Sequence, residues 1–228
     1  MVSTHFDDAA LSVAHLLQRA GSLATVVTVC GGAPARGRAI GEWDAEAGFA
    51  SGREAARLRA LEDARACAVT GARRVRLRHR DGPYRLRPLR AAAIRTSVGR
   101  LVAGGAVLWL PAGIGGHADH IDVSAALLPL AAALPASRVR IYADLPYAGH
   151  SGYGLPAAVA RALPYLHPHD VRLGAAAFAR KLAAVRCHAS QLAPLSARAP
   201  GLLESDGVLA HERFWSAPLV DPPAGVIL

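Results

Sequence analysis

A strand–helix–strand pattern occupies residues 1–29, MVSTHFDDAALSVAHLLQRAGSLATVVTV. Met1–Thr4 are predicted to be the end of a strand, and two aspartates then precede an apolar-periodic run at residues 9–20 that predicts a helix. Gly21 is a typical helix stop, and the β-branched run at residues 23–29 predicts a buried strand. Two strands joined by one crossover helix predict a parallel pair in the same sheet.

The rest of the chain continues this alternation of helices and strands. The alternation predicts an α/β fold with a mostly parallel sheet and helices on both faces. No linker divides the chain, so we expect one domain over residues 1–228. Further helices are predicted at residues 53–70, 91–102, 121–134 and 178–192, and further strands at residues 75–79, 106–110 and 139–142.

The composition excludes several classes of protein. The 228 residues are 52% hydrophobic and 19% charged, which excludes a disordered chain. The apolar runs at residues 102–116 and 123–136 are broken by Gly and Pro, and they fall short of the roughly 18–20 residues that a membrane span needs. Three scattered cysteines fit neither a disulfide scaffold nor a zinc ribbon, and the acidic first residues do not resemble a signal peptide. We therefore expect a cytoplasmic protein.

The formal net charge is +9, and all 26 basic residues except Lys181 are arginine. The arginines are densest between Arg73 and Arg90. This stretch is either a patch for a polyanion or a solvated strand and loop. Aromatic residues make up only 5% of the chain, so stacking platforms for bases are scarce, which argues against nucleic acid as a partner.

Two polar clusters follow predicted strands. His5-Phe6-Asp7-Asp8 comes after the first strand, and Gly115-Gly116-His117-Ala118-Asp119-His120 follows the strand at residues 106–110. Ligands bind beyond the carboxyl ends of strands in open α/β sheets, and imidazole and carboxylate together are ligands that Zn²⁺ accepts. The alternative for the first cluster is a helix cap with a histidine beside it.

Other sequence features are weaker candidates for a functional site. The sequence His167-Pro168-His169-Asp170 could hold a second metal, but it is better interpreted as the cap of a following helix. Cys30, at the end of the second strand, is interpreted as a core residue rather than a ligand. The chain has no G-x-S-x-G motif, and its Gly31-Gly32 loop lacks the P-loop lysine, which argues against a serine hydrolase and a P-loop nucleotide site.

Both clusters match motifs of a known family. The sequence HFDDAALS at residues 5–12 resembles the HPDD motif of the PIG-L / LmbE-like deacetylases, and GGHADH at residues 115–120 resembles their second, HPDH-type motif. Weaker similarities extend this resemblance over nearly the whole chain. They lie at residues 59–62 (RALE), at Asp81 with Tyr84 and Arg85, at residues 142–147 (YADLPY), and at residues 181–191.

The resemblance implies a Rossmann-like fold and a zinc-dependent deacetylase that removes an N-acetyl group from an amino sugar or a glycosylated small molecule. By the same resemblance, His5, Asp8 and His120 would bind the metal, and another divalent ion could replace zinc. Asp7 would be the general base that takes a proton from the attacking water. His117, if protonated, would stabilise the oxyanion.

The remaining implied roles are supporting ones. Asp119 would orient one of the neighbouring histidines without itself binding the metal, and Arg59 and Asp81 would contact sugar hydroxyls. Phe6 and Ala118 stand where the family motifs have proline, which leaves the ligands intact but leaves the substrate open. Two alternatives are a deacylase for a non-sugar natural product, which would use the same metal site, and a basic binding protein with a degenerate site.

Overall fold

The computed structural model describes residues 1–218, so the last ten residues of the predicted domain, 219–228, lie outside the described residues. Helices and strands alternate along the chain, as the sequence predicts. The strands are β1 (Val2–Ser3), β2 (Thr25–Thr28), β3 (Arg73–Arg76), β4 (Leu108–Pro111), β5 (Val139–Tyr142), β6 (His167–Arg172) and β7 (His211–Ser216). The helices are α1 (Asp8–Ala20), α2 (Glu42–Glu46), α3 (Gly52–Thr70), α4 (Ala91–Val102), α5 (Ala118–Ala133), α6 (Tyr147–Ser151), α7 (Ala157–Ala162), α8 (Ala175–Arg186) and α9 (Ala189–Arg198).

In the described part of the chain, the strands form two hydrogen-bonded sheets. The first has the order β1-β2-β3 with parallel pairs throughout, and the second has the order β4-β5-β7-β6. In the second sheet, β4 and β5 are parallel, whereas β7 pairs antiparallel with both β5 and β6. Strands β1 and β4 lie in contact. The carboxyl ends of β1 and β4, where the two polar clusters begin, therefore lie close together.

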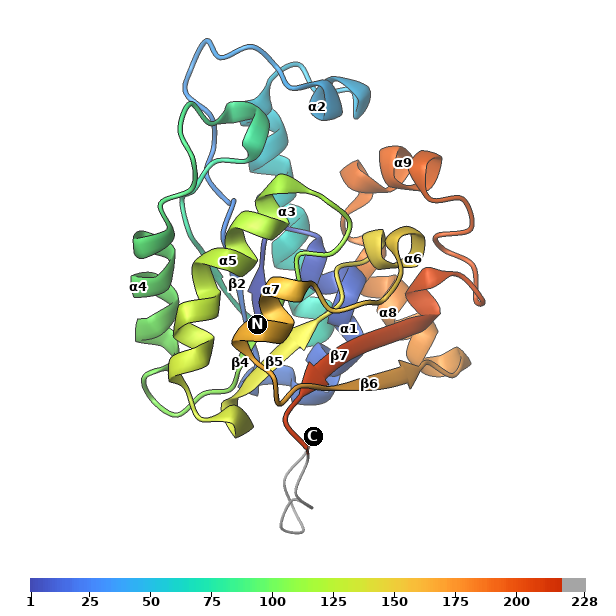
Figure 1. Cartoon of the computed structure of the whole chain (residues 1–228). Helices are drawn as coiled ribbons and strands as arrows, with labels where there is room; N and C mark the ends of the chain where they lie inside the picture. The colour runs from blue at the N-terminus through green and yellow to red at the C-terminus, as the bar shows by residue number, and fades with distance from the viewer. Residues whose placement is uncertain (219–228) are drawn as a thin grey trace.

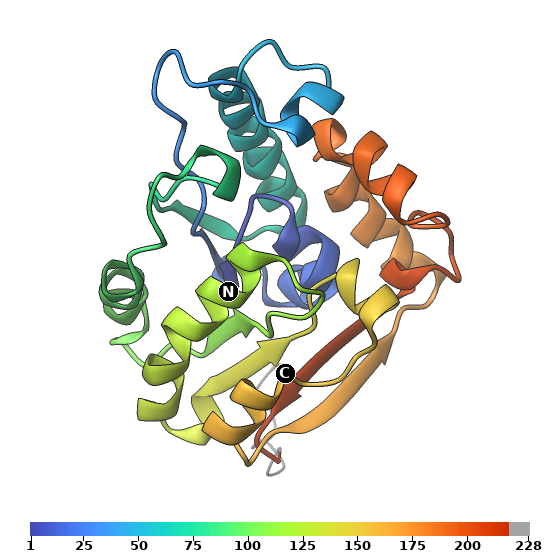
Figure 2. The ribbon, with the colours of Figure 1, turned by 45° about the horizontal axis from the view of Figure 1, so that its top comes forward.

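Helices cover both faces of the strands, which confirms the predicted α/β fold. Figures 1 and 2 show α4 and α5 side by side in front of the strands, with α3 and α8 behind them. The larger core cluster joins α4 and α5 to β4 and β5, through Ile94, Leu127, Leu110 and Ile141 among others. A smaller cluster, which includes Val26 of β2, joins α1 and α3 to the other face. Within residues 1–218, no helix combines the length and the apolar character needed to cross a membrane.

Helix α1 carries the first polar cluster at its start and is bent at Val13, whose φ of −144° is not helical. The bend frees backbone N–H groups in the middle of the helix. The buried carboxylate of Glu212 in β7 accepts the N–H groups of His15 and Leu16, and it pairs with the buried Lys181 in α8 at 3.1 Å. The carboxylate of Glu212 therefore accepts the free N–H groups at the start of the second half of α1, as a capping side chain does at the start of a helix.

Two expectations about local structure are wrong. Residues 167–170, interpreted above as a helix cap, begin the edge strand β6, which pairs with β7 along its whole length. The predicted helix at residues 178–192 is two helices, because His188 has non-helical backbone angles (φ −88°, ψ 49°) and separates α8 from α9. Both errors have one cause: partners distant in sequence decide these segments, and local patterns do not contain them.

Candidate metal centre

The two polar clusters meet in one pocket, at the carboxyl ends of the parallel strands. The pocket has a volume of about 320 Å³ and is lined by residues that follow β1, β3, β4 and β5. This is the edge at which open α/β sheets bind ligands. The polar lining residues are His5, Asp7, Asp8, Asp44, Arg59, Asp81, His117 and Gln191, and the apolar ones include Phe6, Leu11, Trp43, Leu145 and Leu195.

His5, Asp8 and His120 each turn a ligand atom toward the others, and these atoms lie within 4.8 Å of one another. The Nδ1 atom of His5 lies 3.6 Å from Oδ2 of Asp8, and Nε2 of His120 lies 3.4 Å from Oδ1 of Asp8. The Nε2 atom of His120 is buried and has no hydrogen-bond partner within the described residues. A buried imidazole nitrogen facing a carboxylate and a second imidazole fits a divalent ion with nitrogen and oxygen ligands. His5 also belongs to a second possible group, with His117 and Asp119.

The turn that carries His5 and Asp8 is tightly hydrogen-bonded. The backbone N–H of His5 donates to Oδ2 of Asp8 at 2.6 Å. The hydroxyl of Ser3 donates to the carbonyl of His5 and accepts the N–H of Ala9. These bonds fix the loop that the family motif stiffens with proline, while Phe6 is buried beside it.

Further carboxylates contact the two histidines from outside the ligand group. The carboxylate of Asp119 lies 3.2 Å from Nε2 of His5, accepts the N–H of Gly82, and pairs with Arg85 at 2.5 Å. Asp81 lies 3.4 Å from the same nitrogen of His5. On the other side, Oδ1 of Asp144 lies 2.7 Å from Nδ1 of His120. Each histidine therefore has carboxylate partners that hold its ring in place.

These charges set the pKa values of the cluster. Burial alone would lower the pKa of His5 and of His120, but the surrounding carboxylates outweigh it, raising the pKa of His5 well above 6.5 and that of His120 to about 9. Burial opposes the charged form of Asp8, yet the two histidines hold its pKa well below the usual range. The carboxylates of the cluster therefore stabilise positive charge at His5 and His120.

Asp7 lies beside this group and behaves differently. It occupies the N-cap position of α1, but its carboxylate makes no capping hydrogen bond and instead lines the pocket. Burial and the charge of Asp8 raise the pKa of Asp7 to about 6. Asp7 is only 8% exposed, and it is one of the residues that line the pocket. The interpretation of the first cluster as a simple helix cap therefore fails for Asp7.

His117 is the N-cap residue of α5, and its Nδ1 accepts the N–H of Asp119 at 3.3 Å. The proton of the neutral ring is then on Nε2. Burial and the nearby charges of His5 and His120 lower the pKa of His117, so the ring is a neutral donor rather than the cation considered above.

Comparison with known families identifies the family of this chain. A family model described as PIG-L, GlcNAc-PI de-N-acetylase, matches residues 1–131, which is more than half of the chain. The chain belongs to the PIG-L family. Among curated proteins, none matches this PIG-L chain significantly.

Several solved structures resemble this PIG-L chain over almost its whole length. The A40926 pseudoaglycone deacetylase Dbv21 is 28% identical, with 94% of each chain covered and a TM-score of 0.70. A triple mutant of a deacetylase from the teicoplanin biosynthetic pathway is 23% identical, with 94% of this chain and 95% of that chain covered and a TM-score of 0.77. The N,N'-diacetylchitobiose deacetylase from Pyrococcus horikoshii is 16% identical, with 96% and 86% covered and a TM-score of 0.57. The last two likenesses concern the fold alone.

The substrate residues expected from the PIG-L resemblance lie in or beside the pocket, but both have partners within the protein. The guanidinium of the buried Arg59 pairs with Asp44 at 2.5 Å, and Asp44 also accepts the hydroxyl of Tyr84 at 2.5 Å. Asp81 contacts His5, as described above. Arg59 and Asp81 thus reach the pocket as members of internal ion pairs.

Asp144, Arg85 and Tyr147 also belong to the site of this PIG-L chain, although none of them is predicted as a site residue from the sequence. Tyr147 lines the pocket, and its ring centroid lies 5.2 Å from that of His120. The signal for Asp144 was present, because it is the first charged residue after the predicted strand at residues 139–142. For Arg85 the signal was weaker, since it is one of many arginines between residues 73 and 90.

Proposed function

We propose that this PIG-L family chain is a metal-dependent N-deacetylase, which hydrolyses the N-acetyl amide of an amino sugar carried by a glycosylated small molecule. The observation that carries the proposal is the convergence of His5, Asp8 and His120 beside the pocket that Asp7 also lines. Within the described residues, Nε2 of His120 has no hydrogen-bond partner. Family membership and the similarity to Dbv21, which is an A40926 pseudoaglycone deacetylase, support the same reaction class.

His5, Asp8 and His120 would hold the ion, and zinc suits this set of two imidazoles and one carboxylate. Three protein ligands leave coordination positions free for water and for the substrate carbonyl. A bound divalent ion supplies Lewis acidity, which polarises the amide carbonyl and lowers the pKa of water toward neutrality.

Asp7 acts as the general base in this proposal. Its carboxylate takes a proton from the attacking water and then returns that proton to the nitrogen of the leaving amine. Asp7 precedes Asp8 in the chain, so the proton acceptor lies beside the ligand group. The side chain of Asp7 makes no capping hydrogen bond, which leaves its carboxylate oxygens free to accept the proton. The products are acetate and the free amine.

His117 stabilises the oxygen of the tetrahedral intermediate by donating from Nε2. Its Nδ1 is already occupied by the N–H of Asp119, which fixes the tautomer needed for this role. A neutral donor suits a pocket already rich in charge. Asp119 is proposed to orient His5, and Asp81 and Arg59 are proposed to contact sugar hydroxyls at the pocket wall.

The experiment combines metal content with acetate release. The protein is purified without chelators or a polyhistidine tag, its metal is measured by mass spectrometry, and it is incubated with N-acetylglucosamine conjugates that bear apolar aglycones. We expect about one zinc ion per chain and release of acetate. His120→Ala removes a ligand, and His150→Ala, at an exposed histidine, is the matched control.

The outcomes separate the candidate functions. Loss of both metal and activity in His120→Ala, with the control unchanged, supports the proposal. Metal without acetate release from any amino-sugar conjugate redirects the search to amides of non-sugar natural products. A chain that takes up no metal, but binds polyanions in a salt-dependent way, is the basic binding protein instead.

A further inference from the structure

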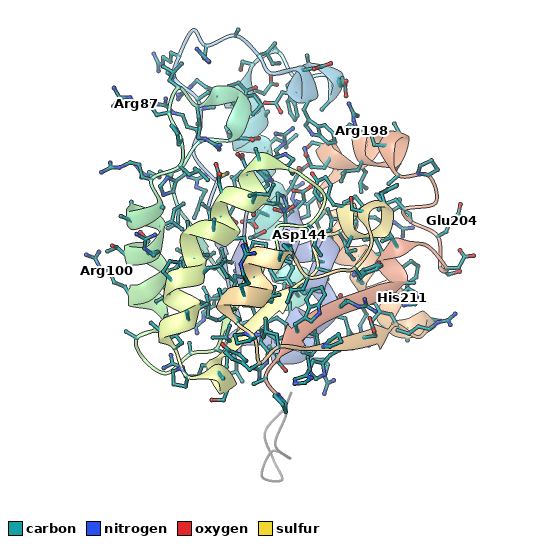
Figure 3. The ribbon with its side chains drawn as sticks, in the orientation of Figure 1. Arg87, Arg100, Asp144, Arg198, Glu204 and His211 are labelled. Atoms are coloured by element: carbon teal, nitrogen blue, oxygen red, sulfur yellow. The ribbon has the colours of Figure 1, made fainter. Side chains whose placement is uncertain are left out.

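Asp144 occupies a junction between three loops of the site. Both of its carboxylate oxygens are engaged, and the residue is buried. One oxygen, Oδ2, accepts the backbone N–H groups of Gly113 and Ile114 at 2.8 and 3.0 Å, in the loop between β4 and α5. The other, Oδ1, lies 2.7 Å from Nδ1 of His120. Figure 3 shows Asp144 near the centre of the molecule, far from labelled surface residues such as Arg100 and Glu204.

The next residue ties this junction to the first polar cluster. The N–H of Leu145 donates to the hydroxyl of Ser12 at 3.0 Å, and Ser12 lies one turn after Asp8 in α1. The loop after β5 is therefore anchored on α1 and on the loop after β4 at once. Helix α1 carries Asp8, and the loop after β4 leads into the first turn of α5, which carries His120.

We infer that Asp144 is a positioning residue that sets the tautomer and orientation of His120. A carboxylate whose second oxygen already accepts two N–H groups acts as an acceptor, so the proton of His120 must be on Nδ1. With Nδ1 held as the N–H donor, Nε2 is the ring nitrogen that can give up its proton and offer a lone pair, and it is the atom that faces Oδ1 of Asp8 at 3.4 Å. Asp144 thus prepares the one nitrogen of His120 that can bind a metal.

An asparagine at position 144 cannot accept hydrogen bonds both from the two backbone N–H groups and from Nδ1 of His120. If its carbonyl oxygen accepts the N–H groups of Gly113 and Ile114, its amide nitrogen faces Nδ1 of His120 and donates to it. The proton of the ring then moves to Nε2, which closes that atom to a metal. If the amide is turned the other way, its N–H groups meet the two backbone donors instead. Either arrangement weakens metal binding while the side chain keeps its shape.

The first test measures Zn²⁺ affinity by competition with a chromophoric chelator. We expect Asp144→Asn to bind Zn²⁺ about 10–100-fold more weakly than the wild type, as is typical when such an outer partner is lost. Asp122→Asn is the matched control, because it also replaces an aspartate by asparagine and removes one negative charge. Asp122 lies in α5, its side chain is 45% exposed, and its carboxylate is 3.8 Å from Arg85. Its affinity should stay within about threefold of the wild type. Equal affinity in Asp144→Asn and the wild type would overturn the inference.

A second measurement needs no variant. Long-range ¹H–¹⁵N NMR of the zinc-loaded wild type, labelled at histidine, identifies which ring nitrogen of His120 carries the proton. We expect it on Nδ1, and a proton on Nε2 would overturn the inference even if Asp144→Asn failed to fold.

The inference rests on one part of the proposed function, which is that the site binds a metal ion. If the wild type takes up no Zn²⁺, both proposals fall. If it binds Zn²⁺ and releases no acetate, the deacetylase proposal fails while the affinity and NMR measurements still decide the role of Asp144.

Discussion

His188 connects the stability of the fold to pH. It is 2% exposed, separates α8 from α9, and faces a small cavity lined mostly by apolar residues such as Phe6 and Leu17. Within the described residues, neither ring nitrogen has a hydrogen-bond partner. Burial lowers the pKa of His188 to about 4, and the charges of Glu62 and Asp8 offset only part of this effect. The ring is therefore neutral in the folded protein at pH 7.

The shift has a definite sign and size. An unfolded histidine has a pKa of about 6.5, so between pH 6.5 and 4 the unfolded chain binds a proton that the folded chain refuses. The free energy of unfolding therefore falls as the pH falls through this window. The full shift corresponds to about 3 kcal/mol, of which about 2 kcal/mol is lost between pH 7 and pH 5.

The assay is urea denaturation of the chelator-treated protein at pH 7 and at pH 5. We expect the wild type to lose about 2 kcal/mol more than His188→Leu between these two values, since the leucine does not titrate. Ionisations that both proteins share cancel in this difference. His150→Leu, at an exposed position, should behave like the wild type. Equal pH dependence in the wild type and His188→Leu would refute the reasoning.

Three other substitutions test the site and its walls. Asp7→Asn should retain zinc and lower kcat by about 10²–10⁴-fold, and near-normal turnover with full metal would rule out Asp7 as the base. Arg59→Gln should lower the free energy of unfolding in urea by about 3 kcal/mol, because it leaves the buried Asp44 without its cation; a loss below about 1 kcal/mol would contradict this. Gly115→Ala should lower the free energy of unfolding by about 2 kcal/mol in the same assay, since residue 115 has a φ of +91° and an added Cβ would overlap the side chain of Tyr147. An unchanged midpoint would show that the loop can move aside.

The sequence is sufficient to predict the α/β fold and the meeting of the two clusters. Residues 1–29 contain a complete crossover unit, and the rule that ligands bind at the carboxyl ends of strands then brings His5 and Asp8 near a cluster more than 100 positions away. The same rule applies to Asp144, which follows β5 directly. The sequence does not indicate that Asp144 contacts His120, because no histidine is adjacent to this aspartate in the sequence.

The errors occur where distant partners decide the structure. Within residues 1–218, strand β6 is an edge strand that pairs with β7 alone, and β7 begins about 40 residues later, so no local pattern indicates the pairing. The break at His188 lies in a run of good helix formers, and burial of the imidazole beside α1 and α3 is visible only in three dimensions. The ion pair of Arg85 with Asp119 is non-local in the same way.

The charge distribution gives the strongest physical argument for a cation at this site. The chain has a formal net charge of +9, yet five of its 17 acidic residues gather around two histidines: Asp7, Asp8, Asp81, Asp119 and Asp144. Grouping carboxylates in a buried pocket is costly unless positive charge compensates them. Arg85 supplies one such charge, and without a metal the raised pKa values of the histidines supply the others. A divalent ion would replace those protons with a stronger and more central charge, so the same carboxylates that raise the histidine pKa values would also attract the metal.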